Sequence, residues 1–148
     1  MILLPFNSNH ARSVYLGNMN KGAPENKESY LQFAPQMEID DLSFSAFDKD
    51  KNIIGSGGFV PIWEGVYEAW LIGSDRLENH VFAVVKTCKA KINTLICEKK
   101  ATRIQAAVSA QWVEANRFAR FLGFQNEGLM RKYGPDKEDY NRYSLIVE

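Results

Sequence analysis

A short helix that is stopped by a glycine constrains the fold of this chain more than any other segment. Residues 115–124 read Ala-Asn-Arg-Phe-Ala-Arg-Phe-Leu-Gly-Phe, an amphipathic pattern that ends at Gly123. Glycine adopts the left-handed conformation that terminates a helix, and Phe124 is then expected to fold back onto the last turn. The later pattern predicts two strands that form a closing hairpin, Leu129–Tyr133 and Tyr140–Val147.

Length and charge limit the class of protein. The chain has 148 residues, enough for a core of its own, so we expect a single domain over residues 1–148. Lys plus Arg and Asp plus Glu both number 18, so no overall charge favours nucleic acid or an anionic membrane. The apolar start, Met1–Phe6, is short and lacks a basic residue, which predicts a strand rather than a signal peptide. No run approaches the roughly 20 apolar residues of a membrane span, so we expect a soluble, cytoplasmic protein.

The two cysteines are not expected to form a disulfide. Cys88 and Cys97 lie nine residues apart in a segment with helical spacing, which places them on opposite faces of one helix, roughly 13 Å apart along its axis. That separation is too large for a disulfide. His10 and His80 are the two histidines of the chain, no zinc-ligand spacing occurs, and we expect no metal site.

Strand patterns follow a polar N-terminal segment. Between Asn9 and Gln36 the composition predicts two short helices around a loop at Gly22-Ala23-Pro24. Alternation over Leu42–Phe47 predicts a strand, and a return strand is expected to begin at Ile53. The near-continuous apolar run Val66–Ile72 predicts a central strand of a sheet.

A long helix is expected next. Asp75 and Glu78 have the spacing of a capping box, in which both side chains bind backbone amides at the helix start, so the helix is predicted to begin at Asp75. Ile104–Val108 is the next predicted strand, parallel to Val66–Ile72 under the right-handed crossover rule. The apolar residues of the helix recur three and four apart, as on one buried face: Leu77, Val81, Val85, Cys88, Ile92, and Leu95 or Ile96.

The segment that contains Leu122-Gly123-Phe124, Glu127-Gly128 and Asp139-Tyr140 resembles the C-terminal third of the GNAT superfamily of N-acetyltransferases. It also resembles the small GNAT-like proteins of tailed bacteriophages, some of which keep the fold without the cofactor signature. The resemblance implies an α/β, GNAT-like (acyl-CoA N-acyltransferase) fold over roughly Leu42 to Val147, a mixed sheet with a central parallel β-α-β-α unit and a C-terminal hairpin. It further implies that the two central strands splay apart and that acetyl-CoA lies in the gap.

The resemblance places the cofactor's pyrophosphate between the central strand and the long helix. Family members have Gln or Arg, two residues, Gly, one residue, and Gly or Ala there, whereas this chain has Gly73-Ser74-Asp75-Arg76-Leu77-Glu78 and lacks the motif. The two acidic residues would compete with a phosphate for the helix amides. The implied cofactor-binding residues are Leu71, Ile72, Gly73, Ser74, Arg76, Leu77 and Asn116.

The helix before Gly123 departs from the family as well. Matching the Leu-Gly-Phe segment places Ala119 where many members have a tyrosine that protonates the leaving thiolate. It places Trp112 where a cofactor-contacting asparagine is common. Asn116 is then either a cofactor contact or an exposed polar residue of a surface helix.

Glu68 is the predicted general base, because it lies on the strand that leads to the implied splay, where related enzymes often place a carboxylate. Glu64 is the second candidate, and His80 is a third if its helix face points to the cleft. The alternative for Glu68 is a residue that faces solvent or pairs across strands. Gly55-Ser56-Gly57-Gly58 does not open a helix, so it does not fit a dinucleotide-binding loop and instead predicts a bulge or a flexible edge.

Two classes of function remain open from the sequence. The first is an acetyl-CoA-dependent N-acetyltransferase that acts on an unknown amine or protein substrate, with Glu68 as its base. The second is a non-catalytic, phage-encoded protein with a degenerate cofactor loop, which would bind a phage or host protein as a virion, assembly or host-interaction module.

Overall fold

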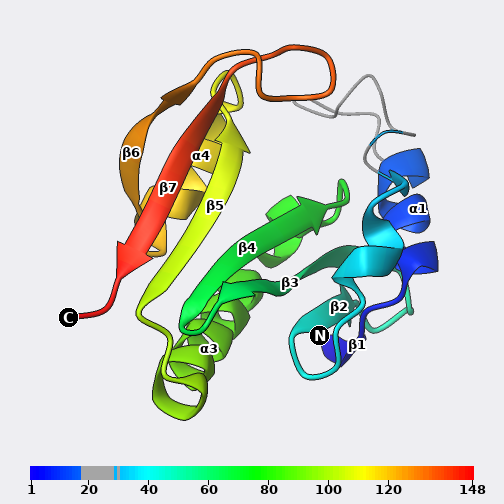
Figure 1. Ribbon diagram of the computed structural model, residues 1–148. Coiled ribbons are helices and arrows are strands. Elements are labelled where there is room, and N and C mark those ends of the chain that lie inside the picture. Colours follow the sequence, from blue (N-terminus) through cyan, green and yellow to red (C-terminus); the bar gives the residue numbers. More distant parts are fainter. Residues whose placement is uncertain (18–28, 30) are drawn as a thin grey trace. The chain divides into compact units, whose positions relative to one another are not determined.

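The computed structural model describes residues 1–17, 29 and 31–148, and it contains a seven-stranded mixed sheet (Figure 1). The strand order is β1-β2-β3-β4-β5-β7-β6. This arrangement confirms the predicted α/β fold class. The elements are β1 (Ile2–Pro5), α1 (Ser8–Gly17), the 3-10 helix η1 (Ala34–Met37), β2 (Ser43–Phe47), β3 (Ile53–Trp63), β4 (Val66–Gly73), the 3-10 helix η2 (Leu77–His80), α3 (Val81–Lys99), β5 (Arg103–Ser109), α4 (Val113–Phe121), β6 (Gln125–Met130) and β7 (Tyr140–Ile146).

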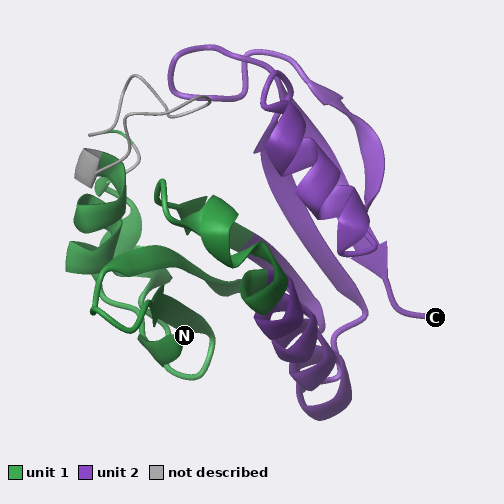
Figure 2. Cartoon of the chain, turned by 180° about the vertical axis from the view of Figure 1, so that it is seen from behind, with its two compact units in different colours: residues 1–60, 70–84 green, residues 61–69, 85–148 purple. Residues whose placement is uncertain are grey.

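The chain forms two compact units (Figure 2). Unit 1 comprises Met1–Val60 and Trp70–Val84, and unit 2 comprises Pro61–Ala69 and Val85–Glu148. Strands β3 and β4 each contribute residues to both units. The single domain expected over residues 1–148 stays a prediction, which the cooperativity of unfolding tests.

In unit 1 the glycines of β3 bring neighbouring backbones close together. A Cβ atom on Gly58 would lie 2.4 Å from the Leu42 carbonyl oxygen, and one on Gly55 would lie 2.6 Å from that of Ile72. The pairing of β2 with β3 also shifts register between Ala46 and Phe47, opposite Gly55. The predicted bulge is therefore present, but the predicted flexible edge is wrong, because β3 lies between β2 and β4.

A buried hydrogen-bond chain crosses β2 and β3 beneath α1. Ser45 and Ser56, which are 0% and 2% exposed, have their hydroxyl oxygens 2.7 Å apart. The Ser45 hydroxyl also lies 2.7 Å from Nδ1 of His10, whose ring packs edge-on against Phe6 and Phe47. Burial lowers the pKa of His10 from its ordinary 6.5, and the negative charge of Glu38 acts in the opposite direction.

The lowered pKa of His10 predicts a pH-dependent loss of stability. As the pH falls through 6.5, the unfolded chain takes up a proton at His10 before the folded protein does. The free energy of unfolding therefore decreases with falling pH until the lower pKa of the folded state is passed. Thermal unfolding between about pH 8 and about pH 5 should therefore show a steeper decline for the wild type than for His10→Gln. Parallel curves for the two proteins would mean that His10 carries none of this dependence.

In unit 2, helix α4 covers one face of β5 and β7 (Figures 1 and 2). β4 pairs with β5 in parallel at three positions, and β5 pairs with β7 in antiparallel fashion along its whole length. Ile104 and Tyr143 are 0% exposed and Leu95 is 2% exposed, which places the core of this unit between the sheet and the helices. The parallel relation of the two central strands confirms the prediction from the sequence.

Helix α4 ends as predicted. Gly123 has φ +99°, its amide donates to the Arg120 carbonyl, and the Phe124 amide donates to the Ala119 carbonyl. These two bonds form a Schellman motif, in which a left-handed residue closes the last turn. Phe124 is 6% exposed, which confirms that it folds back onto the molecule.

Gly123→Val is expected to destabilise the protein by about 1–3 kcal/mol, because a β-branched residue does not tolerate positive φ. A Cβ atom there would meet only Leu145 Cδ1, at 3.7 Å, so the cost arises from the backbone and not from a clash. Denaturant unfolding measures the loss, and Gly123→Asn is the matched control because asparagine tolerates left-handed conformations better. Equal midpoints for wild type and the valine variant would contradict this account.

Two predicted boundaries are wrong. The long helix α3 begins at Val81 after a 3-10 turn, and Arg76 rather than Asp75 precedes that turn, without a side-chain cap. Ser74 organises the turn instead, because its hydroxyl accepts from the Arg76 amide and its carbonyl accepts from the Leu77 amide. In the hairpin, the first strand is β6, four residues earlier than predicted, because the chain enters the sheet directly after Phe124.

Two of the N-terminal expectations are met where the structure describes the chain, namely the first strand and the first of the two helices. β1 and α1 correspond to the predicted first strand and first helix, and the loop at Gly22-Ala23-Pro24 lies outside the described residues. Cys88 and Cys97 both lie on α3 as free thiols, and burial raises the pKa of Cys88 to about 11. Within the described ranges, no helix combines the length and apolar character needed to cross a membrane.

Candidate functional site

Glu68 lies at the last position where β4 pairs with β5, opposite Gln105. Its carboxylate accepts hydrogen bonds from Arg142 Nη1 at 3.0 and 2.9 Å and from Gln105 Nε2 at 2.9 Å. The Glu68 side chain is 27% exposed and that of Arg142 is 20% exposed. Because Arg142 belongs to β7, Glu68 pairs across strands, as one of the two interpretations from the sequence predicted.

The hydrogen-bond network continues from Gln105 to the edge of the sheet. Arg103 Nε donates to Gln105 Oε1 at 2.8 Å, and its two terminal nitrogens donate to Glu127 at 3.0 and 2.6 Å. The Arg103 guanidinium, together with the Ser144 hydroxyl, lowers the pKa of Glu127 to about 2. Because Arg103 only donates and Glu68 accepts, the amide of Gln105 has one orientation that satisfies both neighbours.

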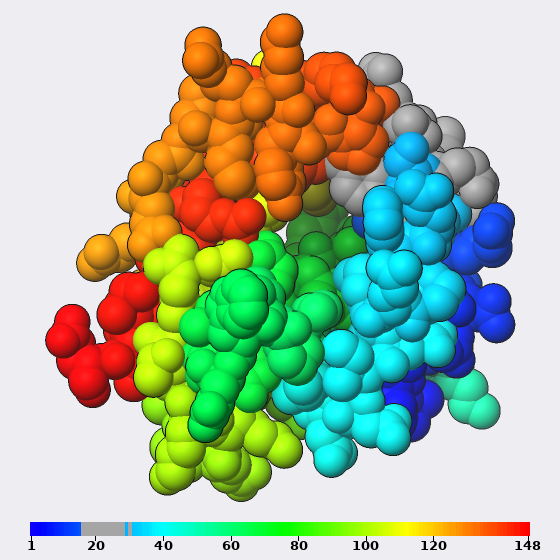
Figure 3. Space-filling model, in the orientation of Figure 1, coloured from blue at the N-terminus to red at the C-terminus, as the bar shows by residue number. Residues whose placement is uncertain are grey.

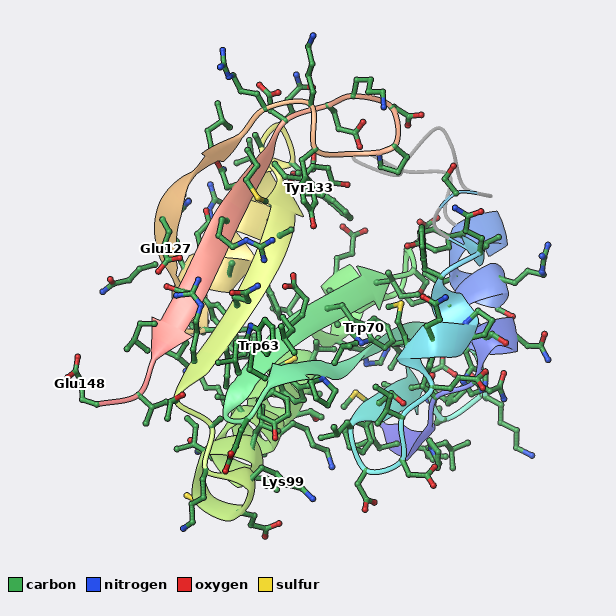
Figure 4. All side chains as sticks on the ribbon, in the orientation of Figure 1. Trp63, Trp70, Lys99, Glu127, Tyr133 and Glu148 are labelled. Carbon is green, nitrogen blue, oxygen red and sulfur yellow. The ribbon has the colours of Figure 1, made fainter. Side chains whose placement is uncertain are left out.

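This network lies on the face of the sheet opposite α4. Arg142 and Ser144 alternate along β7 with Asn141 and Tyr143, whose side chains contact Asn116 of α4. In the view of Figure 4, Glu127 on β6 lies to the left of β7, and Tyr133 on the following loop lies to the right of its upper end. In the space-filling view the atoms of β6 and the loop (orange) and of β7 (red) form part of the surface (Figure 3). The Glu68 and Arg142 side chains on this face, 27% and 20% exposed, are within reach of solvent.

Asn116 lies on the opposite, buried face and is 5% exposed, so the surface reading of this residue is wrong. Its Nδ2 donates to the carbonyls of Ser109 and Trp112 at 2.8 and 2.7 Å. Its Oδ1 accepts from Asn141 Nδ2 and from the Tyr143 hydroxyl, both at 2.8 Å. Both donors and both acceptor positions of the amide are used within the protein.

The other cofactor candidates, Leu71 to Leu77, belong to unit 1, whereas Glu68 and Asn116 belong to unit 2. The Ser74 hydroxyl donates to the carbonyls of Ile53 and Ile54 at 2.7 and 2.9 Å. The side chain of Arg76 is half exposed, and its Nε lies 3.8 Å from Oδ2 of Asp48. The candidates of this segment follow one another along the end of β4 and the turn into η2: Leu71, Ile72, Gly73, Ser74, Arg76 and Leu77.

The remaining candidates lie apart from the network. Glu64 is exposed in the turn between β3 and β4, and His80 is the last residue of η2. Ala119, in the position of the family tyrosine, is 8% exposed on α4. In the part of the chain that the structure describes, no three His, Cys, Asp or Glu side chains are arranged to hold a metal ion.

Sequence reasoning missed the cationic partner of Glu68. Arg142 is 74 residues away in sequence, and only the strand register across β4, β5 and β7 brings it beside Glu68. Tyr133, whose ring centroid lies 6.0 Å from Arg142 Cζ, was missed as well. The alternation of Arg142 and Ser144 with Asn141, Tyr143 and Leu145 is the one signal that marks a polar face on β7.

Comparison with solved structures identifies the fold class as that of the GNAT acetyltransferases. A point mutant of the spermidine N-acetyltransferase SpeG from Vibrio cholerae superposes with a TM-score of 0.69 at 16% identity, over 99% of this chain and 95% of that chain. A GNAT-family acetyltransferase from Bacillus anthracis superposes with a TM-score of 0.68 at 17% identity, over 97% of this chain and 93% of that chain. The ribosomal-protein-S5-alanine acetyltransferase from Vibrio fischeri also has a TM-score of 0.68 at 17% identity, over 97% of this chain and 91% of that chain. We found no match among protein-family models or curated protein sequences.

Proposed function

We propose that this protein is an N-acetyltransferase that transfers an acetyl group from acetyl-CoA to an amine, with Glu68 as general base. The observation that carries the proposal is the position of Glu68: a partly exposed carboxylate at the last paired position of the two parallel strands in a GNAT fold. A fold alone can host several functions, so the carboxylate and its partners bear the chemical argument.

The reaction needs an uncharged amine, because a protonated one has no lone pair for attack. Glu68 would receive the amine proton, directly or through one water, while the hydrogen bond from Gln105 keeps its carboxylate in one orientation. The new bond forms between nitrogen and the acetyl carbon, and the bond from that carbon to sulfur breaks. Ala119 offers no acid for the departing sulfur, so the chemistry would depend on positioning and on the base.

The cofactor would supply the acetyl group as a thioester, and the segment from Leu71 to Leu77 fits it in part. β4 continues to Gly73 beyond its last pair with β5. Arg76 presents a half-exposed guanidinium suited to a phosphate. The Ser74 hydroxyl and the Asn116 amide are already bonded within the protein, so they fit a direct contact less well.

The alternative is a GNAT-like binding protein without catalysis, such as those of phages. Two sequence features favour it: the glycine-containing motif is missing between Gly73 and Glu78, and Ala119 replaces the family tyrosine. Such a protein would keep the fold and the polar network on the sheet face, yet would not turn over acetyl-CoA.

Calorimetry with acetyl-CoA and an assay for released thiol test the proposal together. The acceptors named for the similar structures, spermidine and a peptide with an N-terminal alanine, are suitable first amines. We expect saturable binding of acetyl-CoA that Arg76→Gln weakens by about fivefold or more, with Lys132→Gln as an exposed control that changes nothing. Absence of both binding at about 1 mM acetyl-CoA and acetylated product from a panel of amines would support the non-catalytic alternative.

A further inference from the structure

We propose that Glu68 and the ring of Tyr133 form a binding site for a cationic amine, and that the guanidinium of Arg142 occupies this site when no amine is bound. The inference deepens the proposed function, on which it rests in taking Glu68 to lie at the acceptor site. It names the class of acceptor, a protonated alkylamine, and makes Arg142 an internal competitor for it.

The contacts of Arg142 are those that a cationic ligand would make. Its Nη1 contacts both carboxylate oxygens of Glu68, at 3.0 and 2.9 Å, and its Cζ lies 6.0 Å from the centroid of the Tyr133 ring. A carboxylate supplies charge-assisted hydrogen bonds, and an aromatic face attracts a cation through its quadrupole. One cation therefore already sits between these two groups.

The loop before β7 is built to hold Tyr133 in this place. The ring of Tyr133 packs against that of Tyr140 with centroids 5.2 Å apart. Gly134 follows, and a Cβ atom there would lie 2.7 Å from Cε1 of Tyr140, so a larger residue would require the Tyr140 ring to shift. Tyr133 nevertheless remains 50% exposed, which leaves its ring accessible to a ligand.

Arg142 can leave the site at low cost. The side chains of Arg142 and Glu68 are 20% and 27% exposed, so water solvates both charges when they separate. Glu68 would still keep the hydrogen bond from Gln105 after Arg142 has moved. An incoming ammonium would then take over the carboxylate contact, and its proton would already lie beside the proposed base.

The test is direct binding of 1,4-diaminobutane to the full chain without acetyl-CoA, followed by NMR at constant ionic strength. If Arg142 competes with the ligand, Arg142→Gln should bind the diamine about fivefold more tightly than the wild type, the equivalent of about 1 kcal/mol. Arg142→Lys keeps a competing cation and should stay within about twofold of the wild type. The double variant Glu68→Gln with Arg142→Gln should not bind the diamine more tightly than the wild type does. Arg142→Gln should likewise show no increase in affinity for the uncharged butane-1,4-diol.

Equal or weaker diamine binding by Arg142→Gln would overturn the inference, as would an equal gain for the uncharged diol. Circular dichroism checks that the variant is folded. If it is not, Tyr133→Leu replaces it: the inference then requires weaker diamine binding, and unchanged affinity refutes it. Since acetyl-CoA is absent, failure of the proposed function leaves this result intact. If the protein acetylates an amine but Arg142→Gln does not bind the diamine more tightly, the proposed function holds and the inference about Arg142 is refuted.

Discussion

Glu68→Gln is expected to lower kcat/KM for the acetyl acceptor by about a hundredfold or more, with the affinity for acetyl-CoA nearly unchanged. Glutamine keeps the shape of the side chain and can still accept the hydrogen bonds that now reach Oε1, from Gln105 and Arg142. It has no basic oxygen pair to receive a proton. The loss therefore reports on the base and not on the packing of β4.

Steady-state kinetics at several pH values measure this effect, and Glu127→Gln is the matched control. Glu127 is a second carboxylate on the same face, bonded to Arg103, but it has no part in the proposed chemistry. Its replacement should leave kcat/KM within a fewfold of the wild type. Wild-type turnover by Glu68→Gln across the pH range would show that Glu68 is not the base, even if the protein proves to be an acetyltransferase.

Asn116→Ala is expected to destabilise the protein by about 2–4 kcal/mol, because it leaves several buried polar groups without their partner. The Ser109 carbonyl and the Asn141 amide each lose a bond of 2.8 Å, and the fully buried Tyr143 hydroxyl keeps only the one from Arg120, at 3.2 Å. Denaturant unfolding measures the difference in the free energy of unfolding.

Arg117→Ala is the control for Asn116→Ala, since Arg117 is the next residue of α4 and is exposed. It should change stability by about 0.5 kcal/mol or less. A similar small change for Asn116→Ala would show that its amide is not a structural tie. If the variant is folded at low temperature, its affinity for acetyl-CoA separates a structural role from the predicted cofactor contact, because only the contact requires that affinity to fall.

Local signals in the sequence predicted those parts of the fold that depend on neighbouring residues. The end of α4 at Gly123 is set by backbone conformation within a few residues, and it was predicted correctly. The start of α3 was not, because Asp75 and Glu78 match a capping box while Ser74, anchored to the carbonyls of Ile53 and Ile54, sets the turn. That anchor depends on a tertiary contact with β3, which no local pattern encodes.

The candidate site shows the same division. Alternation and order along the chain placed Glu68 on the strand next to β5, as found. They did not reveal its pairing with Arg142, which depends on the register of three strands. Buried serines were also missed, because Ser45 and Ser56 satisfy their hydroxyls through each other and His10, so that polar residues occupy core positions.

The way the backbone passes between the two units limits how this protein can be divided into gene fragments. The chain passes from one unit to the other after Val60, after Ala69 and after Val84. A fragment that starts at Pro61 therefore carries Trp70–Val84 of unit 1, and a fragment that ends at Val60 lacks them. The piece that ends at Val60 therefore encodes only part of unit 1, while the piece that starts at Pro61 encodes all of unit 2 together with the rest of unit 1, so split-protein reporters cut at this junction would regain unit 1 only when both halves are expressed together.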